Sequence, residues 1–143
     1  MRVLGVDLGR RRIGIAISDP TGLLARPLTT ITVRHASEAL DRVLAEVLRL
    51  AAEDEGLAEI VVGVPVRLDG SPNDETAYAS KFVEGLRART SMPVTAVDER
   101  LTSHEAEGRL AVNERDWRRR KAKLDAAAAA VILQDHLDRA KPR

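Results

Sequence analysis

The hydrophobic pattern of this chain first changes its period near residue 34, and this change limits the folds that the chain can adopt. Short apolar stretches at Val3 to Val6, Ile13 to Ile17 and Leu28 to Val33 are typical of β-strands. From Leu40 to Ala51 the apolar residues instead recur every three or four positions, which predicts a helix. Because only short connections separate the first three stretches, we expect an antiparallel meander that continues into alternating helices and strands.

The rest of the chain continues this alternation. Ile60 to Val64 is apolar without polar alternation, which favours a buried parallel strand, and another strand is expected at Val94 to Val97, after Pro93. Helices are expected at Glu75 to Ala88, at Thr102 to Leu110 and from about Leu124 to Asp138. The order predicts an α/β fold with a mixed five-stranded sheet, three antiparallel strands followed by two parallel ones, and helices on both faces.

The composition favours one folded domain over residues 1–143. With 44% hydrophobic residues, a chain of 143 residues can bury a core of its own. The chain has no cysteine, which excludes disulfides, a thiolate nucleophile and a sulfur-rich zinc site. Its longest uncharged apolar run, Ala126 to Leu133, is too short to cross a bilayer. We therefore expect a cytoplasmic protein.

Positive charge is concentrated in the last third of the chain. Residues 100–143 carry 11 Lys and Arg residues against 7 Asp and Glu residues, although the net charge of the whole chain is only +1. A basic stretch in this part could bind nucleic-acid phosphates, or it could be an ordinary solvated surface. The candidate residues are Arg118, Arg119, Arg120 and Lys121.

Asp7 interrupts the first apolar strand, where aspartate is normally depleted. Gly9, two residues later, allows the chain to turn sharply beside it. The carboxylate of Asp7 therefore either accepts hydrogen bonds in the hairpin turn or has a catalytic role.

Asp98 and Glu99 follow directly after the last predicted strand. Ligands of open α/β sheets usually bind at the carboxyl ends of parallel strands, so this position favours a functional role. Consecutive side chains of a strand point to opposite faces, and hence only one of the two acids is expected in a site. The spacing does not decide which one. The other interpretation is an exposed strand end where Arg100 pairs with an acid.

Asp125 is the third candidate acid, expected in the first turn of the last helix and followed by five alanines. Small side chains let a helix approach a sheet closely, which could bring Asp125 beside Asp7. Three acids at one edge of a sheet would repel each other unless cations lay between them. Carboxylate oxygens prefer Mg²⁺ or Mn²⁺, and two such ions support phosphodiester hydrolysis.

Four arginines near these acids are candidates for binding phosphate groups. Arg10, Arg11 and Arg12 lie in the first hairpin turn, and Arg100 follows the acidic pair. A solvated turn and a structural partner for Asp98 are the alternative interpretations of these residues. With one Trp, one Tyr and one Phe, we do not expect base stacking to be a major source of affinity.

Four segments together resemble one known family over nearly the whole chain. GVDLGRRRIGIAISD, VVGVPVRLDGS, DERLTS and KLDAAAAAVILQ, in this order, are similar to the YqgF (RuvX-like) family, whose members are linked to nuclease processing of pre-16S ribosomal RNA and to Holliday-junction resolvases. The resemblance implies a ribonuclease H-like fold with Asp7, Asp125 and either Glu99 or Asp98 as metal ligands. Of this pair, we expect Glu99 to be the catalytic residue.

The resemblance also implies a function in maturation of the 5′ end of pre-16S ribosomal RNA, with ribosomal particles as possible partners. A DNA Holliday-junction resolvase is one alternative, and a catalytically weak nucleic-acid-binding module in transcription or ribosome assembly is another. A sugar kinase would need two domains around its nucleotide, for which 143 residues are too few. The sequence leaves open whether the protein is a monomer or a homodimer.

Overall fold

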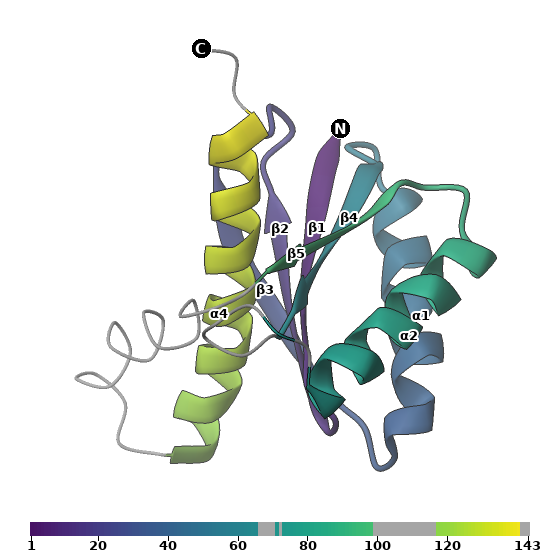
Figure 1. Cartoon of the computed structure of the whole chain (residues 1–143). Coiled ribbons are helices and arrows are strands. Elements are labelled where there is room, and N and C mark those ends of the chain that lie inside the picture. Colours follow the sequence, from purple (N-terminus) through teal and green to yellow (C-terminus); the bar gives the residue numbers. More distant parts are fainter. Residues whose placement is uncertain (66–70, 72, 99–116, 141–143) are drawn as a thin grey trace.

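Five strands form one mixed sheet in the computed structural model of the chain (Figure 1). The structure describes residues 1–65, 71, 73–98 and 117–140, and only the backbone of residues 117–124. The elements in chain order are β1 (Arg2–Leu8), β2 (Arg12–Ser18), β3 (Ala25–Thr32), the short helix η1 (Ala36–Glu38), α1 (Ala39–Ala51), β4 (Leu57–Val64), α2 (Asp74–Arg89), β5 (Val94–Asp98) and α4 (Trp117–Ala140).

The strand order across the sheet is β3-β2-β1-β4-β5. β2 pairs antiparallel with both β1 and β3, whereas β4 pairs parallel with β1 and β5. The predicted sheet of three antiparallel and two parallel strands is therefore confirmed. Because β1, β4 and β5 are parallel, their last residues Leu8, Val64 and Asp98 lie at one edge of the sheet, which we call the carboxyl edge.

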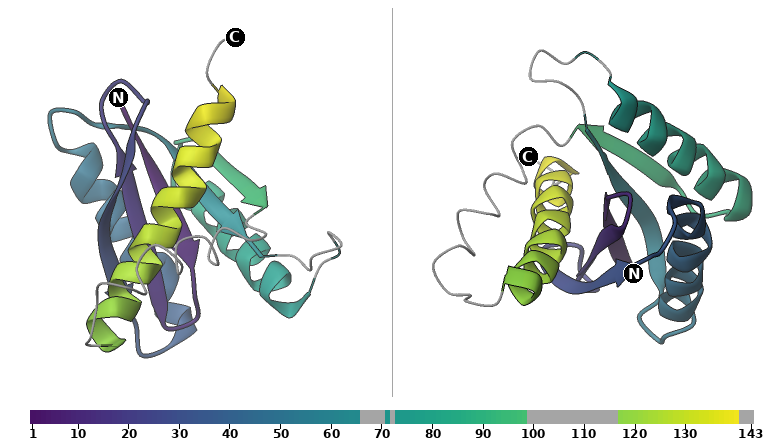
Figure 2. Two further views of the ribbon diagram at one scale, coloured as in Figure 1. Left: turned by 90° about the vertical axis from the view of Figure 1, so that its left-hand side faces the viewer. Right: turned by 90° about the horizontal axis from the view of Figure 1, so that it is seen from below.

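Helices cover both faces of the sheet, as Figure 2 shows: α1 and α2 lie on one face and α4 on the other. The even-numbered residues Leu4 and Val6 of β1 belong to the larger hydrophobic cluster, together with residues of α1 and α2. The odd-numbered Val3 belongs to the smaller cluster, together with Ile132 and Leu133 of α4. This alternation of side chains along β1 assigns each position of the strand to one helical layer.

α4 is longer than the sequence analysis predicted. It begins at Trp117 rather than near Leu124. The segment from Trp117 to Ala140 contains neither glycine nor proline, and its arginines, lysines and alanines favour helix. The expectation that Asp125 lies in the first turn of the helix is consequently wrong, so the helix dipole does not explain its presence. Among the described helices, none is long and apolar enough to span a membrane.

The other predicted elements are found with small differences at their ends. α2 begins at Asp74, one residue before the predicted start, because Asn73 caps the helix: its side chain accepts a hydrogen bond from the backbone N–H of Thr76. β4 begins at Leu57, three residues earlier than predicted. The helix predicted for Thr102 to Leu110 lies outside the described residues.

One charged side chain, Arg2, is buried between β1 and the end of α1, with 6% of the residue exposed. Its guanidinium donates hydrogen bonds to the backbone carbonyls of Leu50 and Gly56 and to the carboxylate of Glu53. The carbonyl of Leu50, in the last turn of α1, also accepts a 3.2 Å hydrogen bond from the backbone N–H of Glu53, so Arg2 is an additional donor to it. Arg2 therefore ties the end of α1 to the first strand.

Replacing Arg2 with methionine is expected to lower the free energy of unfolding by about 1–3 kcal/mol, because the carbonyl of Gly56 loses its side-chain donor while that of Leu50 keeps only the backbone N–H of Glu53. Urea denaturation followed by circular dichroism measures this loss. Arg49→Met is the control, since Arg49 is a half-exposed partner of Glu46 on the surface of α1. An equal loss in both variants would contradict the role assigned to Arg2.

Candidate nuclease site

Asp7 lies on β1 at the carboxyl edge, between two glycines of the neighbouring strands. Its register partners are Gly14 on β2 and Gly63 on β4. Val3 packs against α4, and a Cβ added to Gly5 would meet Leu133 of α4, so the odd-numbered positions of β1 face this helix. Asp7 continues the same alternation. Its carboxylate therefore lies on the α4 face of the sheet, and its register partners on both sides have no side chains.

Asp125 meets the sheet beside Asp7. A Cβ atom on Gly14 would lie only 1.9 Å from the backbone oxygen of Asp125, so α4 rests directly on this glycine. Gly14 is also the register partner of Asp7. The backbone of Asp125 thus reaches the strand position next to Asp7, although the two residues are 118 positions apart in the sequence. The side chain of Asp125 is 24% exposed.

Arg12 contributes a positive charge at the same place. Its Nε atom lies 3.2 Å from Oδ2 of Asp125, and both side chains are partly shielded from solvent. Arg12 lies two residues before Gly14 on β2, and hence on the same face of the sheet. Of the three arginines predicted to bind phosphates, this one contacts a candidate metal ligand directly.

Arg10 and Arg11 lie in different surroundings. Arg10 donates a 2.9 Å hydrogen bond from Nε to Glu75 of α2, and its guanidinium carbon lies 4.6 Å from the centre of the Tyr78 ring. The hydrogen bond and the charge of Glu75 raise the pKa of Arg10 above its usual value. Arg11 is exposed, and its carbonyl accepts a hydrogen bond from the backbone N–H of Val33. The turn that carries these arginines needs Gly9, because a Cβ there would lie 2.3 Å from the carbonyl oxygen of Arg12.

Asp98 faces away from Asp7. Its register partner Val64 packs against the cluster formed with α1 and α2, whereas the preceding Val97 packs against the α4 cluster. Paired residues of neighbouring strands share a face, so the side chain of Asp98 lies on the α1 and α2 side of the sheet. The structure thus brings Asp7 and Asp125 together and leaves Asp98 on the other face.

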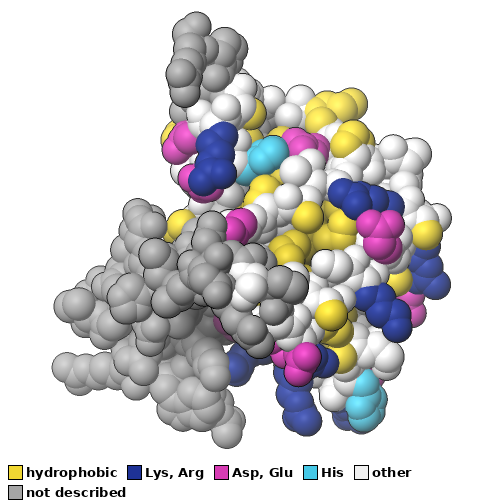
Figure 3. Space-filling view, viewed as in Figure 1, with side chains coloured by type: hydrophobic (Ala, Val, Ile, Leu, Met, Phe, Trp, Pro, Cys, Tyr) yellow, Lys and Arg dark blue, Asp and Glu magenta, His cyan; other side chains and the backbone are white. Residues whose placement is uncertain are grey.

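Several predicted site residues lie beyond the part that can be described. Glu99 and Arg100 lie outside the described residues. Arg118, Arg119, Arg120 and Lys121 lie in the first turns of α4, where only the backbone is described. The basic stretch is therefore helical. On the described face seen in Figure 3, Lys and Arg side chains are interspersed with Asp and Glu side chains rather than gathered into one patch.

The chemistry of the described site fits a divalent cation of the Mg²⁺ type. Asp7 and Asp125 offer oxygen ligands only, which suits this class of ion. Two carboxylates at one point of the sheet repel each other unless a positive charge lies between them, and Arg12 already supplies one such charge to Asp125. Among the described residues, no three acidic or histidine side chains lie close enough together to hold a metal ion. A third ligand would have to come from the rest of the chain, where Glu99 lies.

Two groups of residues near the sheet were not singled out by the sequence. Tyr78 lies against Arg10, and burial raises the pKa of its phenol. On the α4 face, Glu59 accepts a 2.7 Å hydrogen bond from Thr95 and lies 3.3 Å from Nε2 of His136. These contacts join residues 36 to 77 positions apart, so no local sequence signal could have indicated them.

Comparison with known proteins identifies the family of this chain. The family model RuvX, described as "Holliday junction resolvase", matches residues 1–139. A protein of Anaeromyxobacter sp. (strain K), named "Putative pre-16S rRNA nuclease", is 44% identical over 142 residues, which cover 99% of this chain and 100% of that protein. A protein of Roseiflexus sp. (strain RS-1) with the same name is 40% identical over 96% of this chain and 94% of its own length.

The fold is also similar to that of a solved structure. Thermus thermophilus RuvC, in complex with a Holliday junction substrate, superposes with a TM-score of 0.53 at 22% sequence identity, covering 100% of this chain and 99% of that one. At this identity the likeness supports the fold alone, a ribonuclease H-like architecture. The family match and the full-length relatives carry the assignment further: the chain belongs to the RuvX (YqgF) family of nucleases that act on nucleic acids.

Proposed function

We propose that this chain is a divalent-metal-dependent endonuclease that hydrolyses phosphodiester bonds in the precursor of 16S ribosomal RNA. Asp7, Asp125 and Glu99 are the proposed metal ligands and catalytic residues. Mg²⁺ and Mn²⁺ are the proposed ions. The names of relatives that are 40–44% identical over nearly the full length support the choice of substrate.

The observation that carries the proposal is the contact between α4 and β2 at Gly14. At this contact the backbone of Asp125 lies against Gly14, the register partner of Asp7. A packing contact this close needs a residue without a side chain, and glycine is present at that position. A carboxylate pair of this kind, held by two rigid elements at the carboxyl edge of a sheet, suits cation binding better than it suits stability.

The residues around this pair have separable roles. Asp7 and Asp125 would hold the cation, and Arg12 keeps Asp125 oriented and partly neutralised until the cation binds. Arg11, exposed on the hairpin turn beside this pair, is placed to contact a backbone phosphate. When bound, divalent ions would lower the pKa of a water molecule and stabilise the leaving oxygen.

Glu99 is preferred to Asp98 as the third ligand because of the register of β5. Asp98 shares the face of Val64, opposite to that of Asp7. The alternation of side chains therefore favours the residue that follows it. Glu99 itself lies outside the described residues, and its role remains a prediction.

Resolution of a DNA four-way junction is the second candidate, favoured by the description of the family model. Resolving a junction requires two symmetric cuts and thus a two-fold dimer with two sites. A nuclease of ribosomal RNA would instead meet its substrate in the cytoplasm, as naked precursor or on a precursor ribosomal particle, and one site would be enough.

Cleavage of two labelled substrates separates these candidates. A precursor of 16S ribosomal RNA carrying its 5′ extension and a four-way DNA junction are incubated with the protein and Mg²⁺ or Mn²⁺. We expect cutting of the RNA within the 5′ extension, loss of cutting when EDTA removes the metal, and recovery when excess Mn²⁺ is added. The precursor bound in a small-subunit particle is tested in parallel.

Three outcomes would contradict the proposal. Paired cuts in the junction with intact RNA would favour the resolvase function. Cutting that persists in EDTA would exclude metal-dependent chemistry. Binding of the RNA without cutting in any metal would favour a nucleic-acid-binding module instead.

A further inference from the structure

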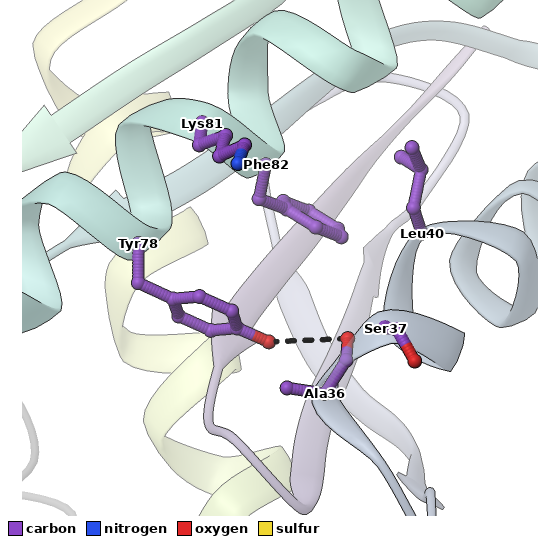
Figure 4. Close-up of a pocket in the computed structure, with 6 residues that line it drawn as sticks. All are labelled: Ala36, Ser37, Leu40, Tyr78, Lys81 and Phe82. Carbon is purple, nitrogen blue, oxygen red and sulfur yellow. Dashed lines mark hydrogen bonds between the residues drawn. The ribbon is translucent and has the colours of Figure 1, made fainter.

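A cavity of about 290 Å³ lies between α2 and the start of α1, on the face of the sheet opposite to α4. Its lining residues are Ala36, Ser37, Leu40, Tyr78, Lys81 and Phe82. Figure 4 shows that the rings of Tyr78 and Phe82 both extend from α2 toward the start of α1, with the Tyr78 hydroxyl directed at the carbonyl oxygen of Ala36. Two of the three aromatic residues of the chain therefore line one cavity.

This cavity and the candidate nuclease site lie on opposite faces of the sheet, but the same hairpin turn contacts residues of both. Arg10 lies over the Tyr78 ring, whereas Arg12 contacts the carboxylate of Asp125. Two residues of chain span at most about 7 Å between their Cα atoms. A nucleic-acid strand that crosses this turn could thus have one nucleotide at the cavity and another, a few positions away, at the carboxylates.

The chemistry of the lining suits a flat ring that is joined to an anion. Phe82 is 6% exposed and forms an apolar floor, while Tyr78 is half-buried and forms one wall. Lys81 is exposed, and within the described part of the chain no carboxylate lies at ion-pair distance from it. Ser37 adds a polar residue to the lining, and the carbonyl of Ala36 accepts a hydrogen bond from the Tyr78 hydroxyl. A purely apolar ligand would make no use of Lys81, and a simple anion would make no use of the rings.

We propose that this cavity binds one unpaired nucleobase of the nucleic-acid substrate, and that Lys81 contacts the phosphate next to it. The proposal rests on the proposed function, since it names a part of the substrate of that same nuclease. A base in the cavity contacts the aromatic rings, and such contacts tolerate all four bases. The enzyme therefore prefers a cut site with an unpaired nucleotide a few positions away over a continuous duplex.

The composition of the chain allows a direct test by NMR spectroscopy. The chain has one Tyr, one Phe and one Trp, so the signals of a tyrosine, phenylalanine or tryptophan ring each belong to a single residue. A short single-stranded oligoribonucleotide is added to the full chain without divalent metal, which prevents cleavage. A strand of equal length and charge with abasic sites at every position is the control. We expect the ring signals of Tyr78 and Phe82 to shift with the first strand but not with the abasic one.

Fluorescence anisotropy with the same two strands gives the affinities. Tyr78→Ala is expected to weaken binding of the base-containing strand about fivefold or more and to leave the abasic strand unaffected, because one stacked base is lost. Tyr78→Phe keeps the ring and should bind as the wild type does. Lys81→Gln should weaken binding of both strands, because it removes a phosphate contact.

Ser37→Leu tests the same cavity without removing a packed side chain. Ser37 is exposed on the short helix η1, so a larger side chain there obstructs the cavity while the core stays intact. The affinity of the Ser37→Leu variant for the base-containing strand should fall toward the affinity of Tyr78→Ala. This variant keeps the test valid if Tyr78→Ala proves unstable.

Equal affinity of the wild type for both strands, or a base-containing strand that binds without shifting the Tyr78 and Phe82 signals, would overturn the base pocket and leave the proposed nuclease function standing. Failure to bind either strand would also overturn the base pocket. The proposed nuclease function fails separately, if the precursor is not cut in the presence of Mg²⁺ or Mn²⁺, so the two failures are distinguishable.

Discussion

Replacing Asp7 with asparagine is expected to reduce phosphodiester cleavage by at least about a hundredfold, while the protein stays folded. Changing a residue that only orients a metal ligand typically lowers metal affinity or activity by about ten- to a hundredfold. Asp7 is itself a proposed ligand, so its loss should cost more. Asparagine has the shape of aspartate without its charge, and both register partners of Asp7 are glycines, so no packing is disturbed. Removing one of two neighbouring negative charges should leave the fold equally stable or slightly more stable.

The measurement has two parts, a cleavage rate on the ribosomal RNA precursor and a titration of Mn²⁺ binding by calorimetry. Asp7→Asn should weaken Mn²⁺ binding and lose cleavage. Asp98→Asn is the matched control, since this exposed aspartate lies on the other face of the sheet at the same carboxyl edge. A wild-type cleavage rate in Asp7→Asn, or equal losses in both variants, would remove Asp7 from the site.

Much of this arrangement could be predicted because it depends on local patterns. The strands of the meander, the helix α1 and the parallel strands follow from the period of the apolar residues. The hairpin between β1 and β2 is short enough that its turn sets the register, which places Asp7 opposite Gly14. The position of Asp7 at the carboxyl edge was thus accessible from the sequence.

The choice between Asp98 and Glu99 was not accessible, because it depends on a register between distant strands. Val64 and Asp98 are 34 residues apart, and their pairing fixes which face Asp98 occupies. A shift of one residue would have exchanged the faces of the two acids. Nothing in the sequence around either strand sets this register, since it depends on how α2, which connects the two strands in the chain, packs on the sheet.

The surroundings of the arginine turn were predictable only in part. The sequence indicated three neighbouring cations near Asp7, without showing that they serve different faces of the sheet. The structure separates them: Arg12 contacts Asp125 in α4, and Arg10 contacts Glu75 and Tyr78 in α2. Both partners come from helices far along the chain, so only the folded arrangement of the layers determines them. The expectation that base stacking would matter little rested on the small number of aromatic residues, and the sequence did not show that Tyr78 and Phe82 line one cavity.

The packing of α4 on Gly14 gives the second large expected effect. In Gly14→Ala, the new Cβ would lie 1.9 Å from the backbone oxygen and 2.4 Å from the carbonyl carbon of Asp125. Backbone atoms cannot move aside as a side chain can, so this end of α4 must shift away from the sheet. Overpacking of this kind costs roughly 1–3 kcal/mol of folding stability. Because Asp125 moves with its helix, and a 1 Å displacement in a catalytic group can cost about a hundredfold in rate, cleavage should fall far more than stability.

Gly5→Ala is the control that separates these two effects. A Cβ on Gly5 would lie 2.8 Å from Cβ of Leu133 and 3.1 Å from the backbone oxygen of Ala129, in the same interface but one to two helical turns beyond Asp125. Urea denaturation should show a loss of stability in both variants. Cleavage, measured where each variant is folded, should be lost in Gly14→Ala and largely kept in Gly5→Ala. If both variants cut at the same rate per folded molecule, the close approach of α4 at Gly14 serves packing alone, and Asp125 is not a ligand that this contact positions.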